Sequence, residues 1–243
     1  QYQSKTAESY VYETDTGIFN KLNDSSDTGY QPAAPPASHP VFIDSYLFLN
    51  SVNTGEIYIS ASQDGSTWDG SYATAESAPD NIVAMAALRG ELWLFGELST
   101  EVWANAAAEG FPFSPIPGTT TGYGCSAPRS VAKTPEQLFW LAKTREGQHR
   151  VVMTNGYTAV PISTPWLEFH LAGYENFSEA VAWTYFQEGH MFYVLTFPTD
   201  NATWVYDISV GLWHERQSAG GRWRAGCFAF VFNKLLVGDL QTG

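Results

Sequence analysis

The stretch that decides the fold is Asn201-Ala-Thr-Trp-Val-Tyr-Asp-Ile-Ser-Val-Gly-Leu-Trp-His-Glu-Arg216. It predicts a strand, a turn that contains Asp207 and Gly211, and a second strand that begins at Leu212. Aromatic and β-branched residues suit a half-buried pleated surface, and Asp, Ser and Gly favour a tight reversal of the chain. The stretch therefore indicates a β-hairpin.

The same pattern occurs near the N-terminus, in Tyr10-Val-Tyr-Glu-Thr-Asp-Thr-Gly-Ile-Phe-Asn20. Four pairs of residues match at one offset of 194 (204 − 10 = 194): Tyr10 with Trp204, Tyr12 with Tyr206, Gly17 with Gly211, and Phe19 with Trp213. A hairpin that recurs at opposite ends of a chain predicts a ring built from one repeated unit.

Short apolar strands recur between these two hairpins. They begin at Tyr46, Leu92, Leu138, Met191 and Leu235, so the spacings are 46, 46, 53 and 44 residues (92 − 46, 138 − 92, 191 − 138, 235 − 191). Strand-rich units with a period in the forties are typical of propeller blades. We predict an all-β fold, a β-propeller of mostly four-stranded antiparallel blades, five by this count.

The expected blades follow one another over residues 41–77, 82–117, 129–164 and 179–218. A fifth blade begins near Arg222 and supplies two strands, Ala225–Phe232 and Leu235–Gly238. Residues 10–22 are expected to complete it, because sharing a blade between the two ends of the chain replaces exposed strand edges with ladder hydrogen bonds. Residues 1–243 are thus expected to form a single β-propeller domain.

Local signals refine this scheme. Asp64-Gly65 and Asn155-Gly156 are expected to form hairpin turns, and a strand is expected over residues 68–75. Prolines in 111–117 allow only an edge strand or a loop. The sequence Gly118–Gly124 is interpreted as a crossing loop.

One passage predicts a helix. Thr164 is expected to cap about two turns that end at Gly173, with Trp166, Phe169 and Leu171 partly on one side.

The net charge is −13, from 12 basic and 25 acidic residues. Such a surface repels nucleic-acid phosphates, so we expect no sequence-specific nucleic-acid binding, whereas an acidic wall past which DNA slides is compatible with this charge. Only residues 145–150 and 216–224 are locally basic. No run of about 18 apolar residues occurs, so no membrane span is expected.

The sequence predicts no catalytic, cofactor-binding or metal-binding residues, and no enzyme. Cys125 and Cys227 lack CxxC spacing and are interpreted as small buried thiols, with a disulfide as the alternative. Glu168 and His170 have no third ligand in view, so no catalytic zinc is expected there. Glu188 with His190, and His214 with Glu215, are interpreted as solvated loop or strand-edge residues. Three acids in apolar surroundings are interpreted as turn or edge residues: Glu168, Glu179 and Asp239.

A second class of function stays open at this point. Ser62-Gln-Asp-Gly-Ser-Thr-Trp68 is similar to the Asp-box loop of sialidase propellers, although it is one residue short and occurs once. With the aromatic content of 15%, it supports the alternative of a carbohydrate-binding or glycan-processing propeller. Aromatic side chains exposed together at one end of the fold would favour that alternative.

Several segments in order along the chain carry a resemblance to a known family. They include Gly90-Glu-Leu-Trp-Leu-Phe-Gly96, Ser99-Thr-Glu-Val-Trp103, Phe111-Pro-Phe113, Trp140–Lys143, Thr154–Tyr157, Tyr193–Pro198, Ala202–Asp207, Gly211–Arg216 and Leu236–Asp239. From about residue 75 to 240 the chain resembles the packaged-DNA stabilisation proteins of short-tailed bacteriophages.

The resemblance implies a structural tail component, a nozzle of the head–tail connector, which helps close the portal channel and retains packaged DNA until ejection. It implies a place in the virion after assembly in the bacterial cytoplasm. The implied partners are tail subunits on the portal and adaptor side and on the fibre or spike side, contacted through loops such as 23–40 and 105–124. The full-length protein is expected to form a homo-oligomeric ring, and this chain, an expected excerpt, a monomer. Six blades are the alternative if flanking sequence joins the ring.

Overall fold

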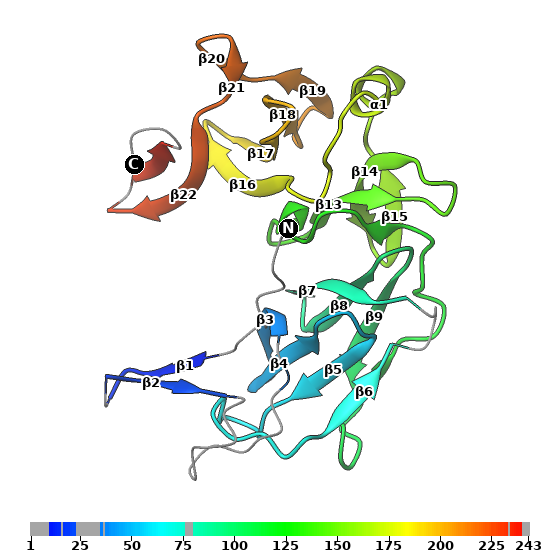
Figure 1. Cartoon of the computed structure of the whole chain (residues 1–243), viewed down its shortest axis with the longest axis vertical. Helices are drawn as coiled ribbons and strands as arrows, with labels where there is room; N and C mark the ends of the chain where they lie inside the picture. The colour runs from blue at the N-terminus through cyan, green and yellow to red at the C-terminus, as the bar shows by residue number, and fades with distance from the viewer. Residues whose placement is uncertain are drawn as a thin grey trace, which may run out of the picture. The chain divides into compact units, whose positions relative to one another are not determined.

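The computed structural model describes residues 10–15, 17–22, 35, 37–75, 80–232 and 234–239. Apart from the helix α1 (Pro165–Leu171) and the 3-10 turn η1 (Pro128–Ser130), its regular elements are strands (Figure 1). The expected all-β class is therefore confirmed. The chain divides into two compact units, residues 1–124 and 125–243.

The first unit contains two four-stranded antiparallel meanders. One consists of β3 (Ala37–Ile43), β4 (Tyr46–Ser51), β5 (Glu56–Ile59) and β6 (Tyr72–Thr74). The other consists of β7 (Ile82–Leu88), β8 (Glu91–Gly96), β9 (Thr100–Asn105) and β10 (Phe113–Pro115). Each strand pairs with the next in sequence, as in propeller blades. The proline-bearing β10 is an edge strand, as predicted.

One apolar core joins these two meanders. Phe48 and Ile57 from the first meander and Leu92 from the second are fully buried in it. The Phe48 ring meets the edge of Phe113 at 4.8 Å between centroids. Alternate residues of neighbouring strands therefore face inward, which is how two antiparallel sheets pack face to face.

The second unit begins with a sheet whose first strand is interrupted. β11 (Gly124–Cys125) and β12 (Ala132–Lys133) both pair with β13 (Leu138–Lys143), and η1 lies between them in the chain. β14 (His149–Asn155) and β15 (Thr158–Pro161) complete the sheet. Asn155 is paired with Thr158, and Gly156 has φ +60°, so the predicted Asn-Gly hairpin turn is confirmed.

The next sheet contains the hairpin predicted over residues 201–216. Its order is β16 (Val181–Gln187), β17 (His190–Phe197), β18 (Ala202–Asp207) and β19 (Leu212–Glu215). It packs on the preceding sheet through Phe139 and Tyr193, whose rings stack at 5.3 Å between centroids. Thr184 Oγ1 also donates to Lys133 O at 2.7 Å. The predicted boundaries of this blade, 179–218, therefore contain one complete meander.

Helix α1 has the predicted position and cap. Thr164 Oγ1 accepts a hydrogen bond from Leu167 N at 3.3 Å. Of the three residues expected partly on one side, Trp166 is 54% exposed and Phe169 is 79% exposed, whereas Leu171 is buried. The buried pair is Leu167 and Leu171, which lie one turn apart on a single face.

The turn at Asp64-Gly65 also differs from the prediction. Ala61 and Asp64 form an isolated bridge, and the positive φ (61°) falls on Gln63 rather than on Gly65. The strand expected from residue 68 begins at Tyr72. Trp68 instead turns inward, and its Nε1 donates to Gly65 O at 3.0 Å. Burial of this indole takes the segment out of the strand.

The terminal hairpins reproduce the two offsets found in the sequence. In β1 (Tyr10–Glu13) and β2 (Ile18–Lys21), Tyr12 is opposite Phe19, as Tyr206 is opposite Trp213. In β22 (Ala225–Val231) and β23 (Lys234–Asp239), Phe228 is opposite Val237. Thr184 and Tyr193, which lie 44 residues earlier, are paired in the same way.

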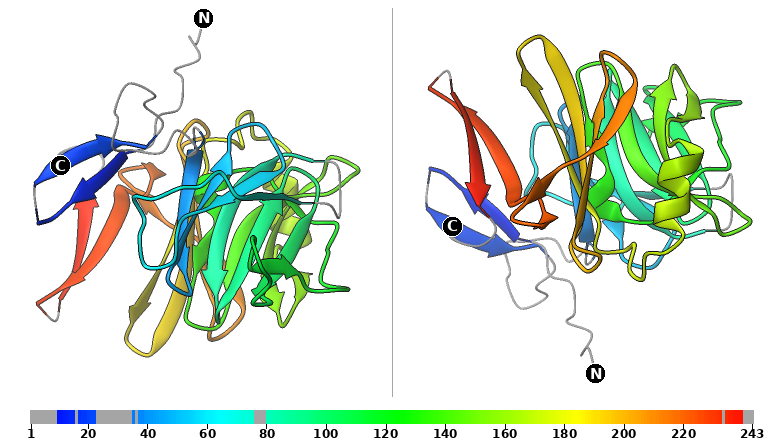
Figure 2. Two further views of the ribbon diagram at one scale, coloured as in Figure 1. Left: turned by 90° about the horizontal axis from the view of Figure 1, so that it is seen from below. Right: turned by 90° about the horizontal axis from the view of Figure 1, so that it is seen from above.

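Each terminal hairpin is a separate two-stranded sheet. In Figure 2 the hairpin of β22 and β23 follows the sheet of β16–β19 along the chain, and β22 contacts β16. The completion of one blade by both hairpins stays a prediction. Residues 23–34 of the predicted contact loop 23–40 lie outside the described residues.

Candidate interaction site

The locally basic stretch 216–224 contains three arginines in three different environments. The guanidinium of Arg216 lies 4.9 Å from the ring centroid of Trp223 and 5.4 Å from that of Phe192, in a cation–π cluster. Arg224 makes a two-pronged ion pair with Asp239, at 2.6 Å for Nη2–Oδ2 and 3.1 Å for Nε–Oδ1. Arg222 makes neither kind of contact with the part of the chain that the structure describes.

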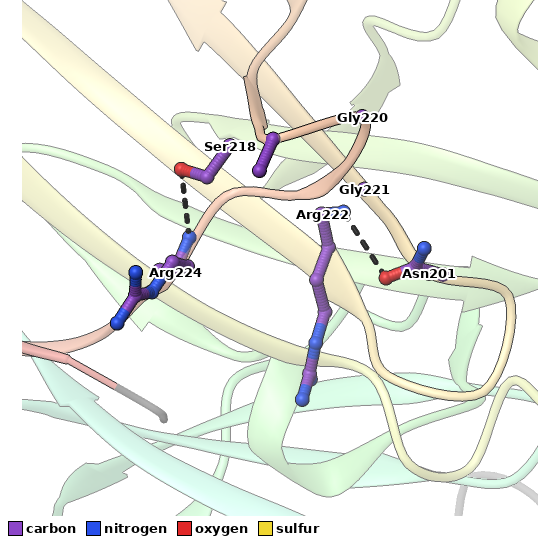
Figure 3. Close-up of a pocket in the computed structure, with 7 residues that line it drawn as sticks. Asn201, Ser218, Gly220, Gly221, Arg222 and Arg224 are labelled. Carbon is purple, nitrogen blue, oxygen red and sulfur yellow. Dashed lines mark hydrogen bonds between the residues drawn. The ribbon is translucent and has the colours of Figure 1, made fainter. Parts of the chain in front are cut away.

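A short ribbon holds Arg222 in place. It consists of β20 (Gln217–Ser218) and β21 (Gly221–Arg222). Arg222 N donates to Asn201 Oδ1 at 3.1 Å, and the arginine side chain extends away from that bond (Figure 3). A Cβ at Gly221 would lie 2.7 Å from Asn201 Nδ2, so a larger residue here would displace the Asn201 side chain that holds Arg222 N.

Two cavities flank the Arg222 side chain. One, of about 270 Å³, is lined by the ribbon turn, Asn201 and Arg224. The other, of about 180 Å³, is lined by Arg222 and Arg129 together with apolar side chains of β16. The sequence signal for this site was the basic stretch itself. The contribution of Arg129, from η1, had no sequence signal because it lies 93 residues earlier (222 − 129 = 93).

The acids singled out in the sequence are each engaged locally and do not converge. Glu168 Oε1 accepts from Ser163 Oγ at 2.8 Å and lies 3.5 Å from Arg150 Nε, an ion pair without a hydrogen bond. Glu179 accepts from Thr199 Oγ1 at 2.7 Å, and Asp239 is the partner of Arg224. These contacts stabilise loops and strand ends.

The histidines that the sequence paired with nearby acids have other partners. His190 Nδ1 lies 2.7 Å from Asp207 Oδ2, so its acid comes from the neighbouring strand β18 rather than from Glu188. His170 Nδ1 donates to Trp166 O at 2.8 Å within α1. His214 Nε2 accepts from Arg216 Nε at 3.3 Å. Sequence proximity missed the cross-strand pair because the strand register places residues 17 positions apart side by side.

One serine and one histidine form a pair that the sequence did not predict. Ser126 Oγ and His149 Nδ1 are 3.0 Å apart, and the imidazole stacks on Phe177 at 3.6 Å between centroids. Burial, with a smaller effect of Lys143, lowers the pKa of His149 to about 4. Within the described residues no carboxylate contacts this imidazole. A histidine with so low a pKa is a weak base at neutral pH, so the pair is structural.

The Asp-box-like loop uses its polar groups internally. Asp64 Oδ1 accepts from Ser66 Oγ at 2.6 Å and from Ser66 N at 2.9 Å, and Oδ2 accepts from Thr67 Oγ1 at 2.7 Å. These hydrogen bonds from Ser66 and Thr67 lower the pKa of Asp64 to about 2. The carboxylate therefore closes the turn.

The two cysteines differ, and the expectation that both are buried is wrong for Cys227. Cys125 is buried, and burial raises its pKa to about 12. Cys227 is exposed because it lies on the two-stranded β22–β23 ribbon, and neither thiol forms a disulfide. In the described ranges no group of three His, Cys, Asp or Glu residues is placed to hold a metal ion. No helix among the same residues has the length and apolar character needed to cross a bilayer.

Comparison with solved structures supports the fold. Over 84% of this chain and 45% of the other, the chain is similar to dihydro-heme d1 dehydrogenase NirN in complex with DHE, at 15% identity and a TM-score of 0.50. Over 97% of this chain and 29% of the other, it is similar to the extracellular domain of the putative one component system BT4673 from B. thetaiotaomicron, at 8% identity and a TM-score of 0.52. The chain thus spans less than half the length of either protein, and at these identities the likeness concerns the fold alone.

No curated protein matches the sequence. A family model does match, over residues 4–243, and its description is Bacteriophage P22 Gp10, beta-propeller. The match covers nearly the whole chain and includes the segments on which the resemblance to phage DNA-stabilisation proteins was based. The antiparallel meanders are the blades that such a fold requires. This chain therefore belongs to the phage β-propeller family of Bacteriophage P22 Gp10.

Proposed function

We propose that this protein is a structural component of the phage head–tail connector, a nozzle that helps close the portal channel and retains packaged DNA until ejection. The observation that carries the proposal is the family match over residues 4–243. It is supported along the chain by the succession of antiparallel meanders, which is typical of propeller blades.

The charge of the chain suits a wall that DNA passes. Every phosphate bound by a protein needs a compensating cation. With 12 basic against 25 acidic residues, the chain offers few such cations. Of the arginines in the basic stretch, Arg216 and Arg224 are engaged by aromatic rings and by Asp239. The proposed wall therefore releases DNA easily once the channel opens.

A mechanical and non-enzymatic role agrees with the side chains that the sequence singled out. Glu168, Glu179 and Asp239 each hold a neighbouring residue. His149 is half-buried and has a pKa of about 4. Each of these groups is thus engaged in local contacts within the protein.

Contacts with other tail subunits are proposed on the portal and adaptor side and on the fibre or spike side. In the loop 105–124, residues 105–110 are exposed. Further along the same loop, Thr121 is pinned to Thr100 by two backbone hydrogen bonds of 2.9 and 3.1 Å. An exposed loop tip on a fixed base suits docking at small entropic cost. The full-length protein is proposed to form a homo-oligomeric ring in the virion.

The glycan-binding alternative receives less support. It requires aromatic side chains exposed together, but six tryptophans are buried: Trp68, Trp93, Trp103, Trp140, Trp183 and Trp204. The Asp64 loop, its other support, is closed by its own hydrogen bonds.

The test is genome retention in the phage or prophage that encodes this chain. Particles assembled without the full-length protein are expected to package DNA and then lose it, measured as protected DNA per capsid, and to recover when the protein is supplied in trans. Particles that keep their DNA and take up the remaining tail subunits normally contradict the proposal.

A further inference from the structure

Arg129 and Arg222 line the same small cavity in the second unit. Arg129 lies in η1, between β11 and β12, and Arg222 is the last residue of β21. The cavity has a volume of about 180 Å³. Two arginines from separate elements, the exposed Arg129 and the half-buried Arg222, therefore line one space of side-chain size.

Neither charge is neutralised by the described part of the chain. No ion pair or hydrogen bond joins the guanidinium of Arg129 or Arg222 to another described side chain. By contrast, Arg150, Arg216 and Arg224 each have a carboxylate or an aromatic partner. In a chain of net charge −13, carboxylates are plentiful, so two open arginines beside one cavity indicate a site for an external anion.

The remaining walls are apolar. Val181, Trp183 and Pro198 line the cavity with Ala225. Trp183 is fixed by stacking on Trp223 at 5.6 Å and on Phe228 at 5.0 Å between ring centroids. The one hydroxyl of the lining, on Thr196, is already bonded to Thr203 at 3.1 Å. The cavity therefore offers cationic donors and apolar contact, with little capacity to accept hydrogen bonds.

We propose that this cavity binds the carboxylate of a glutamate side chain presented by a protein partner. The alkyl stem of glutamate would contact Trp183 and Pro198, and its two oxygens would meet the planar donors of Arg129 and Arg222. The choice of a virion protein as the source rests on the proposed function, whereas recognition of the carboxylate rests on the cavity alone.

Two other anions fit the cavity less well. An acidic sugar carries hydroxyl groups that need acceptors, and an unpaired buried hydroxyl costs binding energy. Nucleic acid binds through many phosphates along a basic surface, which a chain of this charge lacks. Glutamate needs only what the lining residues provide.

The test titrates the full chain with a doubly blocked tripeptide, acetyl-Gly-Glu-Gly-amide, followed by NMR of arginine Nε–H and tryptophan indole signals. Saturable shifts of Trp183, Arg129 and Arg222 are expected. The matched peptide with glutamine in place of glutamate is expected to bind about tenfold more weakly, because it has lost the charge.

Variants assign the site. Arg129→Gln and Arg222→Gln are each expected to weaken the binding of the tripeptide about tenfold. Arg145→Gln, in the exposed turn between β13 and β14, removes the same charge and is expected to change nothing. Arg222→Lys keeps the charge but lacks the planar fork, so intermediate binding is expected.

Several outcomes overturn the proposal. They are no saturable shift, equal binding of the glutamine peptide, or equal loss with Arg145→Gln. Tighter binding of glucuronate or of a short oligothymidylate would assign the cavity to a sugar or to DNA instead. Because this assay uses the isolated chain, its failure leaves the genome-retention result untouched, and a failed retention assay leaves the carboxylate site standing.

Discussion

Two hairpins of this chain share one sequence pattern and have different surroundings. In β1–β2, Tyr10 is 53% exposed and Tyr12 is 52% exposed. Their counterparts in β18–β19, Trp204 and Tyr206, are 2% and 8% exposed. The strand register is the same in both hairpins, and both turns carry a glycine of positive φ, +71° at Gly17 and +74° at Gly211.

The comparison separates what a hairpin determines for itself from what its neighbours add. Strand, turn and register follow from the local pattern. Burial follows from distant residues, because Trp204 Nε1 donates to Tyr174 Oη at 2.9 Å and its ring meets Trp166 at 5.1 Å. A repeat read from sequence therefore predicts local geometry more reliably than exposure.

The largest effect is expected from deleting the exposed hairpin, β1–β2. If residues 10–22 complete the last blade, deleting residues 1–23 exposes a strand edge, and we expect aggregation, measured by light scattering and by the soluble yield. A soluble deletion variant with unchanged unfolding would contradict the shared blade.

The offsets also give the register of that blade. Tyr193 is paired with Tyr206. The offset of +44 takes Tyr193 to Val237, and the offset of −194 takes Tyr206 to Tyr12, so Val237 is expected opposite Tyr12. In a Cys227→Ser background, Tyr12→Cys with Val237→Cys is expected to form a disulfide on mild oxidation, seen by mass spectrometry. Glu13→Cys with Val237→Cys, one residue out of register, is the control and should stay reduced.

Truncation of the buried copy is the next largest effect. Trp204→Ala is expected to lower the free energy of unfolding by about 3–5 kcal/mol, measured by urea denaturation, because it removes a large side chain from the core. Tyr10→Ala, at the matching exposed position, is expected to cost less than about 1 kcal/mol if the hairpin stays uncovered. Equal losses at the two positions would show that both hairpins are covered.

A smaller effect is expected at the turn glycine of positive φ, which both hairpins have. Gly211→Ala is expected to cost about 1 kcal/mol because of its positive φ. The added Cβ would lie 3.6 Å from Tyr206 Oη, an ordinary contact, so the backbone is the sole cause. Gly122→Ala, where φ is not positive and nothing lies within 4 Å of the added Cβ, is the control and should leave the denaturation midpoint nearly unchanged.

The last effect is confined to acidic pH, and it weakens the unit that holds the buried hairpin without changing the hairpin. Burial lowers the pKa of His149 from 6.5 to about 4 in the folded state. The unfolded state therefore binds a proton first as the pH falls below 6.5, and stability drops until the pH reaches about 4. His149→Gln is expected to flatten this part of a stability–pH profile. An unchanged slope would assign the pH dependence to other groups.

The sequence predicted the features that depend on neighbours along the chain. The hairpins, the Thr164 cap and the edge position of β10 all follow from short patterns. It failed where distant residues decide. Trp68, expected in a strand, is buried against Leu22 and Leu49 from other parts of the chain. His190 pairs with Asp207 on the neighbouring strand.

The candidate site shows the same limit. Arg222 was visible as part of a basic stretch, but Arg129 joins it only through the arrangement of η1 beside β16. The Leu167–Leu171 face of α1 was missed because Leu171 was grouped with Trp166 and Phe169, which are exposed. An aromatic side chain is buried only where another part of the chain packs against it.

The unequal cysteines give the native chain a built-in reporter. Cys227 is exposed on β22, whereas Cys125 is buried and has a pKa of about 12. An alkylating dye should therefore attach at a single known place without mutagenesis. Cys227 lies on the β22–β23 hairpin, which is predicted to pair with residues 10–22. The labelling rate is therefore expected to fall when another strand covers this hairpin. Followed during virion assembly, the same rate would show at which step the hairpin becomes covered.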